Sequence, residues 1–197
     1  MTRVLIVGAN GQIARVATAL FLQQPDVQLT LFLRRARRLQ SLASERVRVV
    51  EGDAQDAKAL AAAMLGHDVV YANLDGPLAQ MARNLVAAMH TSGLKRLIFI
   101  SSMGIYGEVP GQAYRSVLDP YRDAAAVIEQ SDLDYTLLRP SWLNDRDEIA
   151  YGTTQRGEPF KAGDDTVSRK SVADLVVKLS LTPDLHVRQS LGVHKEN

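Results

Sequence analysis

A glycine-rich turn near the first residue constrains this chain more than any other feature. Residues 4–24 read VLIVGANGQIARVATALFLQQ, an apolar run followed by the spacing G-x-x-G-x-x-A and then by a helical pattern. Small residues are needed where a backbone swings from a strand into a helix and approaches a phosphate closely. The following helix directs free N–H groups and the positive end of its dipole toward that anion. The turn therefore predicts a dinucleotide site, with an ordinary strand–helix turn as the alternative.

The rest of the chain alternates short apolar segments with helical patterns. Segments rich in Val, Ile and Leu on both faces are typical of parallel strands covered by helices on each side. Right-handed crossovers then give an α/β fold, a Rossmann-type doubly wound parallel sheet in three α/β/α layers. The expected strands are 3–7, 28–33, 47–51, 68–72, 96–101, 134–138 and 189–193, and the expected helices are 11–24, 54–65, 77–92, 119–130 and 171–181.

In the second half of the chain, the residues that mark the ends of helices and strands are less regular. Asp119 followed by Pro120 is typical of an N-cap and a first helical turn. Ser171 and Asp174 have the spacing of a capping box. Residues 140–170 contain many Gly, Asp and Thr residues without a clear period, which predicts a loop-rich substrate lid. We expect residues 1–197 to form a single NAD(P)-binding domain.

Composition excludes several classes of function. The chain has 197 residues, a formal net charge of +1, four histidines and no cysteine. Its length suits one core. Its near-neutral charge argues against nucleic acid or an anionic membrane as a partner. Without cysteine there are no disulfides and no thiolate sites, and the scattered histidines predict no metal site. Because the chain shows neither a signal segment nor a long apolar run, a cytoplasmic protein is expected.

A cluster of arginines follows the second expected strand, in the stretch FLRRARR. NAD sites usually carry Asp or Glu here to hold the ribose 2′-hydroxyl, but Leu33 occupies that position. Guanidinium groups instead suit a 2′-phosphate, which they can bind through two hydrogen bonds. Arg34 and Arg35 are therefore expected to bind the phosphate, whereas Arg38 is expected on a solvated face. The pattern predicts NADP(H) in preference to NAD(H).

Five segments together resemble the short-chain dehydrogenase/reductase superfamily, in its atypical NmrA-like branch, which also contains proteins similar to NAD-dependent epimerases and dehydratases. Their order and spacing extend over nearly the whole chain, which makes the resemblance specific. The segments are GANGQIA (8–14), EGDAQD (51–56), SSMGIYG (101–107), LDYTLLRPSWL (133–143) and VSRKSVADLVVKL (167–179).

The resemblance implies a set of cofactor-binding residues. Asp53 would bind the adenine amino group, and it could cap the next helix either instead or at the same time. The stretch from Arg139 and Pro140 to Leu143 would lie by the nicotinamide. For Trp142, the only tryptophan, both core packing and substrate stacking remain open. The implied cofactor-binding residues are Gly8, Asn10, Gly11, Gln12, Ile13, Arg34, Arg35, Asp53, Ala54, Asn73, Leu74, Ser101, Arg139 and Pro140.

The catalytic residues depart from the family pattern. Ser102 matches the serine that holds a carbonyl substrate, and Tyr121 is the candidate tyrosine. Catalytic members carry Lys four residues after this tyrosine, where it lies on the same helical face and lowers the pKa of the phenol. Here that position is Ala125, and no other tyrosine has Lys at this spacing. We therefore expect the usual proton relay to be absent, with Arg122 or Arg139 as a third possibility for the missing charge.

Two functions remain open. The first is an NADPH-dependent oxidoreductase acting on a flavin-, quinone- or carbonyl-type small-molecule acceptor. An acceptor that takes its proton from water needs no tyrosine–lysine pair. The second is a non-catalytic NmrA-like redox sensor, which binds NADP(H) and reports to a regulatory protein partner. A homodimer formed through the helices that flank the sheet is a further expectation.

Overall fold

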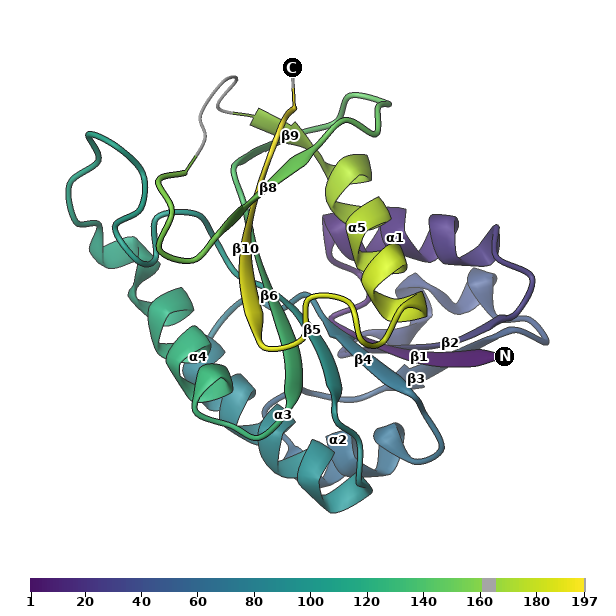
Figure 1. The fold of residues 1–197 in the computed structure, drawn as a ribbon. Coiled ribbons are helices and arrows are strands. Elements are labelled where there is room, and N and C mark those ends of the chain that lie inside the picture. The colour runs from purple at the N-terminus through teal and green to yellow at the C-terminus, as the bar shows by residue number, and fades with distance from the viewer. Residues whose placement is uncertain (161–165, 197) are drawn as a thin grey trace.

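The computed structural model describes residues 1–160 and 166–196 and contains an eight-stranded sheet with helices on both faces (Figure 1). The strand order is β3-β2-β1-β4-β5-β6-β10-β8, and all neighbours are parallel except β10 and β8. The main-sheet strands are β1 (Thr2–Val7), β2 (Val27–Leu33), β3 (Val47–Glu51), β4 (Val69–Ala72), β5 (Arg96–Ile100), β6 (Asp134–Pro140), β8 (Gly152–Gln155) and β10 (Gln189–His194). The α-helices are α1 (Gln12–Leu22), α2 (Ala57–Met64), α3 (Leu78–Ser92), α4 (Asp119–Glu129) and α5 (Arg169–Leu181). The predicted doubly wound sheet is confirmed.

Two apolar layers enclose the sheet, because successive side chains of a strand point to opposite faces. In β1, Val4 and Ile6 join the layer beneath α1 and α5, whereas Leu5 and Val7 join the layer beneath α2, α3 and α4. Figure 1 shows α1 beside α5 on one face and the other three helices on the opposite face. Burial on both faces explains why the strands are continuously apolar in sequence.

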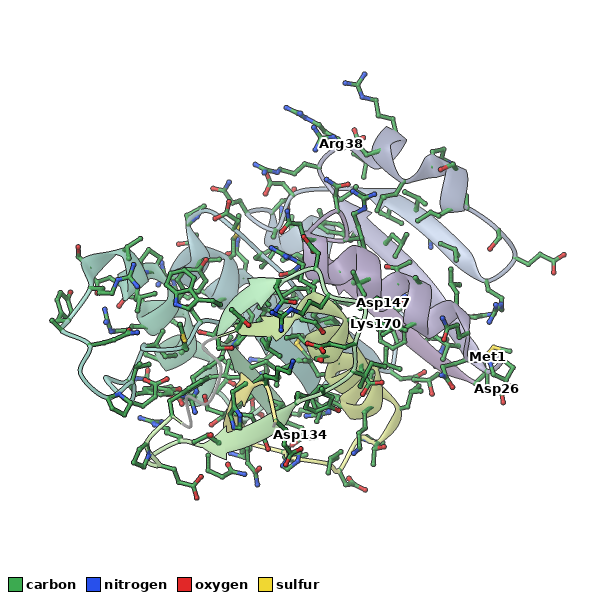
Figure 2. All side chains as sticks on the ribbon, turned by 90° about the horizontal axis from the view of Figure 1, so that it is seen from above. Met1, Asp26, Arg38, Asp134, Asp147 and Lys170 are labelled. Atoms are coloured by element: carbon green, nitrogen blue, oxygen red, sulfur yellow. The ribbon has the colours of Figure 1, made fainter. Side chains whose placement is uncertain are left out.

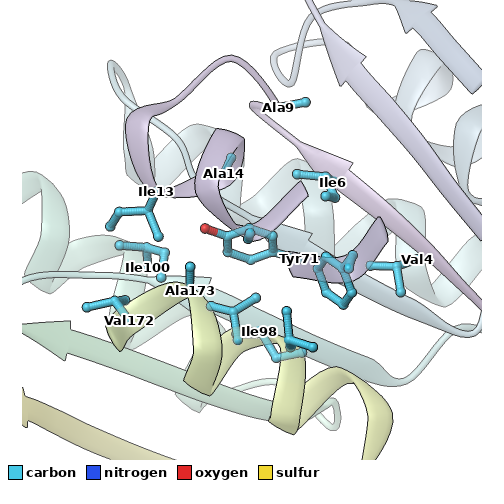
Figure 3. Packing of buried hydrophobic residues seen from close by; sticks show 14 of the residues in the cluster. Val4, Ile6, Ala9, Ile13, Ala14, Tyr71, Ile98, Ile100, Val172 and Ala173 are labelled. Atoms are coloured by element: carbon cyan, nitrogen blue, oxygen red, sulfur yellow. The ribbon is translucent and has the colours of Figure 1, made fainter. Parts of the chain in front are cut away.

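Figure 3 shows the packing of the first layer around Tyr71 of β4. Its hydroxyl group points toward the part of the cluster that holds Ile13, Ala14 and Ile100. Among the described residues this hydroxyl has no hydrogen-bond partner, and burial raises the pKa of the phenol. A phenol in such surroundings stays protonated and serves as an apolar packing element.

The reversal of strand order sets where a ligand can bind. From β1 the chain proceeds to β2 and β3 on one side and later returns to β4 on the other side. Their connections therefore diverge at the carboxyl ends of β1 and β4 and leave a crevice between them. The glycine turn that follows β1 lies at this point.

The helix caps differ from those expected. Helix α4 includes Asp119 instead of starting after it, and Leu118 precedes the helix. The carboxylate of Asp119 accepts hydrogen bonds from Tyr114 and Arg122, so it does not cap the helix. Helix α5 is capped by Ser168, whose hydroxyl accepts a hydrogen bond of 2.9 Å from the backbone N–H of Ser171. The capping serine was therefore predicted three residues too late.

The segment predicted to be loop-rich contains three short strands. Strands β7 (Trp142–Asn144) and β9 (Thr166–Ser168) pair in a separate parallel sheet, and β8 forms the antiparallel edge of the main sheet. The part of the expected lid at 161–165 lies outside the described residues. No helix in 1–160 or 166–196 is long and apolar enough to cross a membrane.

Arg139 forms a buried ion pair instead of facing the crevice. Along β6, Leu138 belongs to the layer under α1 and α5, so the next side chain points to the opposite face. The fully buried guanidinium pairs with Glu108 and donates hydrogen bonds of 3.0 Å and 3.1 Å to the side-chain and backbone oxygens of Ser190. The Glu108 carboxylate also accepts from the backbone N–H of Gly104 and of Tyr106, which fixes the loop after β5. The implied placement of Arg139 by the nicotinamide is therefore wrong for its side chain.

We expect Glu108→Ala to lower the free energy of unfolding by about 3–5 kcal/mol, because it leaves a buried guanidinium without its counter-charge. Denaturant unfolding followed by circular dichroism measures this loss. Asp147→Ala is the control, because it breaks the exposed Asp147–Lys170 pair visible in Figure 2. That exposed pair is worth less than about 1 kcal/mol. Similar losses in the two variants would contradict this interpretation.

Candidate functional site

Two adjacent clefts lie at the carboxyl ends of the central strands. The first, of about 460 Å³, is bounded by the glycine turn and by the residues that follow β2 and β3. The second, of about 500 Å³, is bounded by the residues that follow β5 and β6 and by α4. Asn73 and Leu74, directly after β4, line both clefts and form the wall between them. A ligand long enough to pass this wall can occupy both clefts.

The glycine turn packs directly against the end of β4. Gly8 has φ of +80°, and a Cβ atom at this position would lie 2.1 Å from the carbonyl oxygen of Asn73. A Cβ atom on Gly11 would lie 2.2 Å from the Asn73 Nδ2 atom. Gly11 precedes α1 without a side-chain cap, so the first N–H groups of the helix have no such partner. With Asn10 and Gly11 in the cleft wall, this turn leaves space and hydrogen-bond donors for a pyrophosphate.

Three arginines surround the other end of the first cleft. Arg34, Arg35 and Arg38 all line it, and no described residue forms an ion pair with any of their guanidinium groups. The Glu51 carboxylate accepts a 3.0 Å hydrogen bond from the backbone N–H of Ala36, which anchors the arginine segment to β3. Arg38, visible in Figure 2, was expected on a solvated face, but it is both exposed and part of the cleft wall. In the 3-10 turn η1 (Ala36–Arg38), the backbone N–H of Arg38 donates a 3.1 Å hydrogen bond to the carbonyl oxygen of Arg35.

Asp53 and Ala54 line the first cleft beside these arginines. The Asp53 carboxylate accepts a 2.9 Å hydrogen bond from the N–H of Gln55, and the buried amide of Asn84 donates to the Ala54 carbonyl oxygen. The side-chain cap of α2 is Asp56, which accepts hydrogen bonds from two backbone N–H groups of the first turn. The alternative that Asp53 caps this helix is therefore wrong, and its second carboxylate oxygen accepts no hydrogen bond from a described residue.

The remaining predicted residues of the turn differ in position. Ile13 lines the second cleft, where it is almost fully buried. Gln12 is the first residue of α1, is exposed and lines neither cleft. Only the backbone N–H of Gln12, in the uncapped first turn of α1, is placed to interact with an anion through the helix dipole.

The second cleft brings together Ser101, Ser102 and Pro140, as the sequence implies, with Ser141 and Trp142. The hydroxyl groups of Ser101 and Ser141 are buried and have no partner among the described residues. Buried hydroxyls are normally hydrogen-bonded, so an unpaired pair in a cleft wall is suited to a polar ligand. Ser141 belongs to the stretch 139–143 that the resemblance places beside the nicotinamide, and it lines the second cleft, although the sequence does not single out its hydroxyl.

Trp142 is 53% exposed at the rim of the second cleft. Core packing, one of the two roles left open for the only tryptophan, is therefore wrong. An exposed indole beside a cleft offers a planar apolar surface to an aromatic ligand.

Tyr121 lines the same cleft, but nothing on α4 activates it. Ala125, one turn later, is 1% exposed and packs in the core, so a lysine there would have to enter that core. Arg122 donates to the backbone oxygen of Ile105 and pairs with Asp119, so it contributes no charge to the phenol. Burial, together with the nearby Asp75 carboxylate, raises the pKa of Tyr121. The phenol is therefore protonated at neutral pH.

Comparisons with known proteins agree with this geometry. A family model described as NAD(P)H-binding matches residues 8–183. A Rossmann-fold NAD(P)-binding protein of Shigella flexneri is 40% identical, with a TM-score of 0.89 over 100% of this chain and 95% of that one. A short-chain dehydrogenase/reductase of Veillonella parvula, solved in complex with NADP, is 30% identical with a TM-score of 0.88 over the same shares. The Bacillus subtilis protein named uncharacterized sugar epimerase YhfK is 27% identical over 199 residues, 89% of this chain and 86% of its own.

The fold and the two clefts thus define a nucleotide-binding protein of the Rossmann class. The chain belongs to the NAD(P)H-binding family. This membership confirms the resemblance to the atypical short-chain dehydrogenases/reductases. The residues present fit such a cofactor: the glycines leave a cradle that a Cβ atom would fill, and the second cleft has buried hydroxyls without a partner among the described residues.

We expect Gly8→Ala to lower the free energy of unfolding by more than about 2 kcal/mol, because a Cβ atom there adds a backbone clash to a strained φ. Gly93→Ala is the matched control, since Gly93 also has positive φ but has no atom within 4 Å of the added Cβ. Denaturant unfolding measures both variants. A loss at Gly93 equal to that at Gly8 would refute the close approach of the turn to Asn73.

Proposed function

We propose that the chain is an NADPH-dependent reductase of a planar small-molecule acceptor that takes its proton from water, such as a flavin or a quinone. The observation that carries the proposal is the pairing of two clefts across Asn73. One cleft has the glycine turn and three arginines that pair with no described carboxylate, and the other has an indole surface but no lysine one helical turn after Tyr121. An NADP complex in a relative 30% identical to this chain supports the choice of cofactor.

When bound, the nicotinamide supplies a hydride, which is two electrons and one proton. The open start of α1 would hold the pyrophosphate, and Arg34, Arg35 and Arg38 would hold the 2′-phosphate. Asp53 would accept a hydrogen bond from the adenine amino group. Ser101 and Ser141 would orient the polar groups that reach the second cleft. The acceptor gains the hydride and one proton from solvent, so no side chain has to change its protonation state.

The missing lysine is what separates this proposal from carbonyl reduction. A ketone needs a proton donor of suitable pKa at its oxygen as the hydride arrives. The raised pKa of Tyr121 makes its phenol a poor partner for that exchange at neutral pH. Reduced flavins and hydroquinones exchange protons readily with water. The site chemistry therefore favours flavin- and quinone-type acceptors.

Replacement of Arg34, Arg35 and Arg38 together by Gln is expected to weaken NADPH binding by about a hundredfold, because each guanidinium can form charge-assisted hydrogen bonds to the 2′-phosphate. The dissociation constant for NADH should change little. Isothermal titration calorimetry measures both. Arg37→Gln is the control, because Arg37 lies in the same turn but lines neither cleft. Tighter binding of NADH than of NADPH by the unaltered protein would end the proposal for NADP(H).

Tyr121→Phe is expected to change the rate of NADPH oxidation with FMN by less than about threefold, because a proton relay contributes about 10²–10⁴-fold only where it operates. Steady-state kinetics between pH 6 and 9 check this, and the variant should keep the pH profile of the parent. The NADPH dissociation constant of the variant is the control for intact folding. A hundredfold loss would place Tyr121 in the reaction.

The absence of a tyrosine–lysine pair also favours a second candidate, a non-catalytic redox sensor that binds NADP(H) and a regulatory protein partner. The two candidates differ in turnover. Steady NADPH oxidation with flavins or quinones supports the reductase. Tight NADPH binding without oxidation across both acceptor classes would instead favour the sensor.

A further inference from the structure

The second cleft carries positive charge that its described walls do not neutralise. Of the described residues that line it, Arg115 and Arg169 are charged, and none is a carboxylate. Asp75 influences Tyr121 electrostatically but lines the first cleft. A cleft with this balance attracts an anion.

The two arginines are held differently. One guanidinium nitrogen of Arg169 lies 2.8 Å from the exposed carboxylate of Asp145, whereas its buried Nε has no partner among the described residues. Arg115 forms no side-chain hydrogen bond or ion pair with a described residue, so its charge is available to a ligand. Its backbone oxygen accepts a hydrogen bond from Arg122, which fixes the main chain at this point.

Arg115 also lies beside the aromatic surface of the cleft. Its guanidinium carbon is 5.8 Å from the centre of the Trp142 ring system. Both side chains are exposed, and both line the second cleft. The guanidinium lies over the indole in a cation–π contact and has no counter-charge among the described residues, so an aromatic surface and a cation meet at the cleft rim. A planar ring could stack on the indole while a charged substituent on that ring reaches the guanidinium.

From this juxtaposition we infer that the acceptor is a planar conjugated molecule that carries an anionic group, a phosphate, carboxylate or sulfonate, which Arg115 binds. The inference rests on the proposed reductase function and names the class of acceptor for the same site. Arg115 is a specificity residue here, because it distinguishes acceptors by charge and takes no part in hydride transfer. For a flavin, NADPH and one proton from water give NADP⁺ and the dihydroflavin: the flavin gains the hydride of NADPH and one proton from water.

The test compares two acceptor pairs that differ in charge but share a ring system: FMN with riboflavin, and a naphthoquinone with and without a sulfonate. Because Trp142 is the only tryptophan, quenching of its fluorescence reports binding at this rim independently of turnover. We expect the anionic member of each pair to bind about tenfold more tightly, as one charge-assisted hydrogen bond allows. The same preference should appear in kcat/KM for NADPH oxidation.

Arg115→Gln should abolish the preference and leave the affinity for riboflavin and for NADPH within about twofold. Arg48→Gln is the matched control, because Arg48 is exposed on β3 and lines neither cleft, so it removes one charge elsewhere. Retention of the preference in this control, with its loss in Arg115→Gln, supports the inference.

The other outcomes separate the two proposals. Equal binding of charged and neutral acceptors overturns the inference, while their reduction by NADPH would leave the reductase function standing. If anionic acceptors quench Trp142 fluorescence at lower concentration than neutral ones but NADPH is not oxidised, the binding site is supported and the reductase function is overturned. A tenfold rise in the NADPH dissociation constant of Arg115→Gln would assign this arginine to the cofactor and overturn the inference.

Discussion

The close approach of the first turn to the end of β4 is the constraint on which the rest of the site depends. The oxygen and amide atoms of Asn73 occupy the space where side chains at Gly8 and Gly11 would lie. The glycines therefore bring two strand ends together and at the same time leave donors exposed at the start of α1. Because Asn73 also separates the two clefts, this single contact sets where both of them begin.

The two clefts present different polar groups. The first cleft offers backbone donors and unpaired guanidinium groups, which suit a polyanion. The second offers buried hydroxyls, an indole and the guanidinium of Arg115, which pairs with no described carboxylate; these groups suit a planar polar molecule. The buried Glu108–Arg139 pair belongs to neither cleft, and it fixes the loop that carries one wall of the second. The arginine that supports the loop is thus distinct from the arginines that line the two clefts.

Most of the sheet could be predicted from sequence, because buried parallel strands are apolar on both faces and because glycines mark the turn after the first strand. The errors have local causes. Ser168 and Ser171 are both plausible caps, and only the backbone decides between them. Arg139 follows four buried residues of a strand, and alternation from Leu138 would have directed its side chain into the far layer. The place of Arg38 in the cleft wall depends on how its 3-10 turn folds, which no periodicity reports.

The margins of the sheet bear on how copies of this chain can associate. One margin is β3, five residues long with Arg48 exposed on it, and the other is β8, four residues long and antiparallel to its neighbour. Short, polar or charged margins present a poor template for an incoming strand. Pairing of either edge strand with a strand of another molecule is therefore disfavoured. An interface between copies of this chain would therefore have to use its helical faces, where packing of side chains replaces backbone pairing.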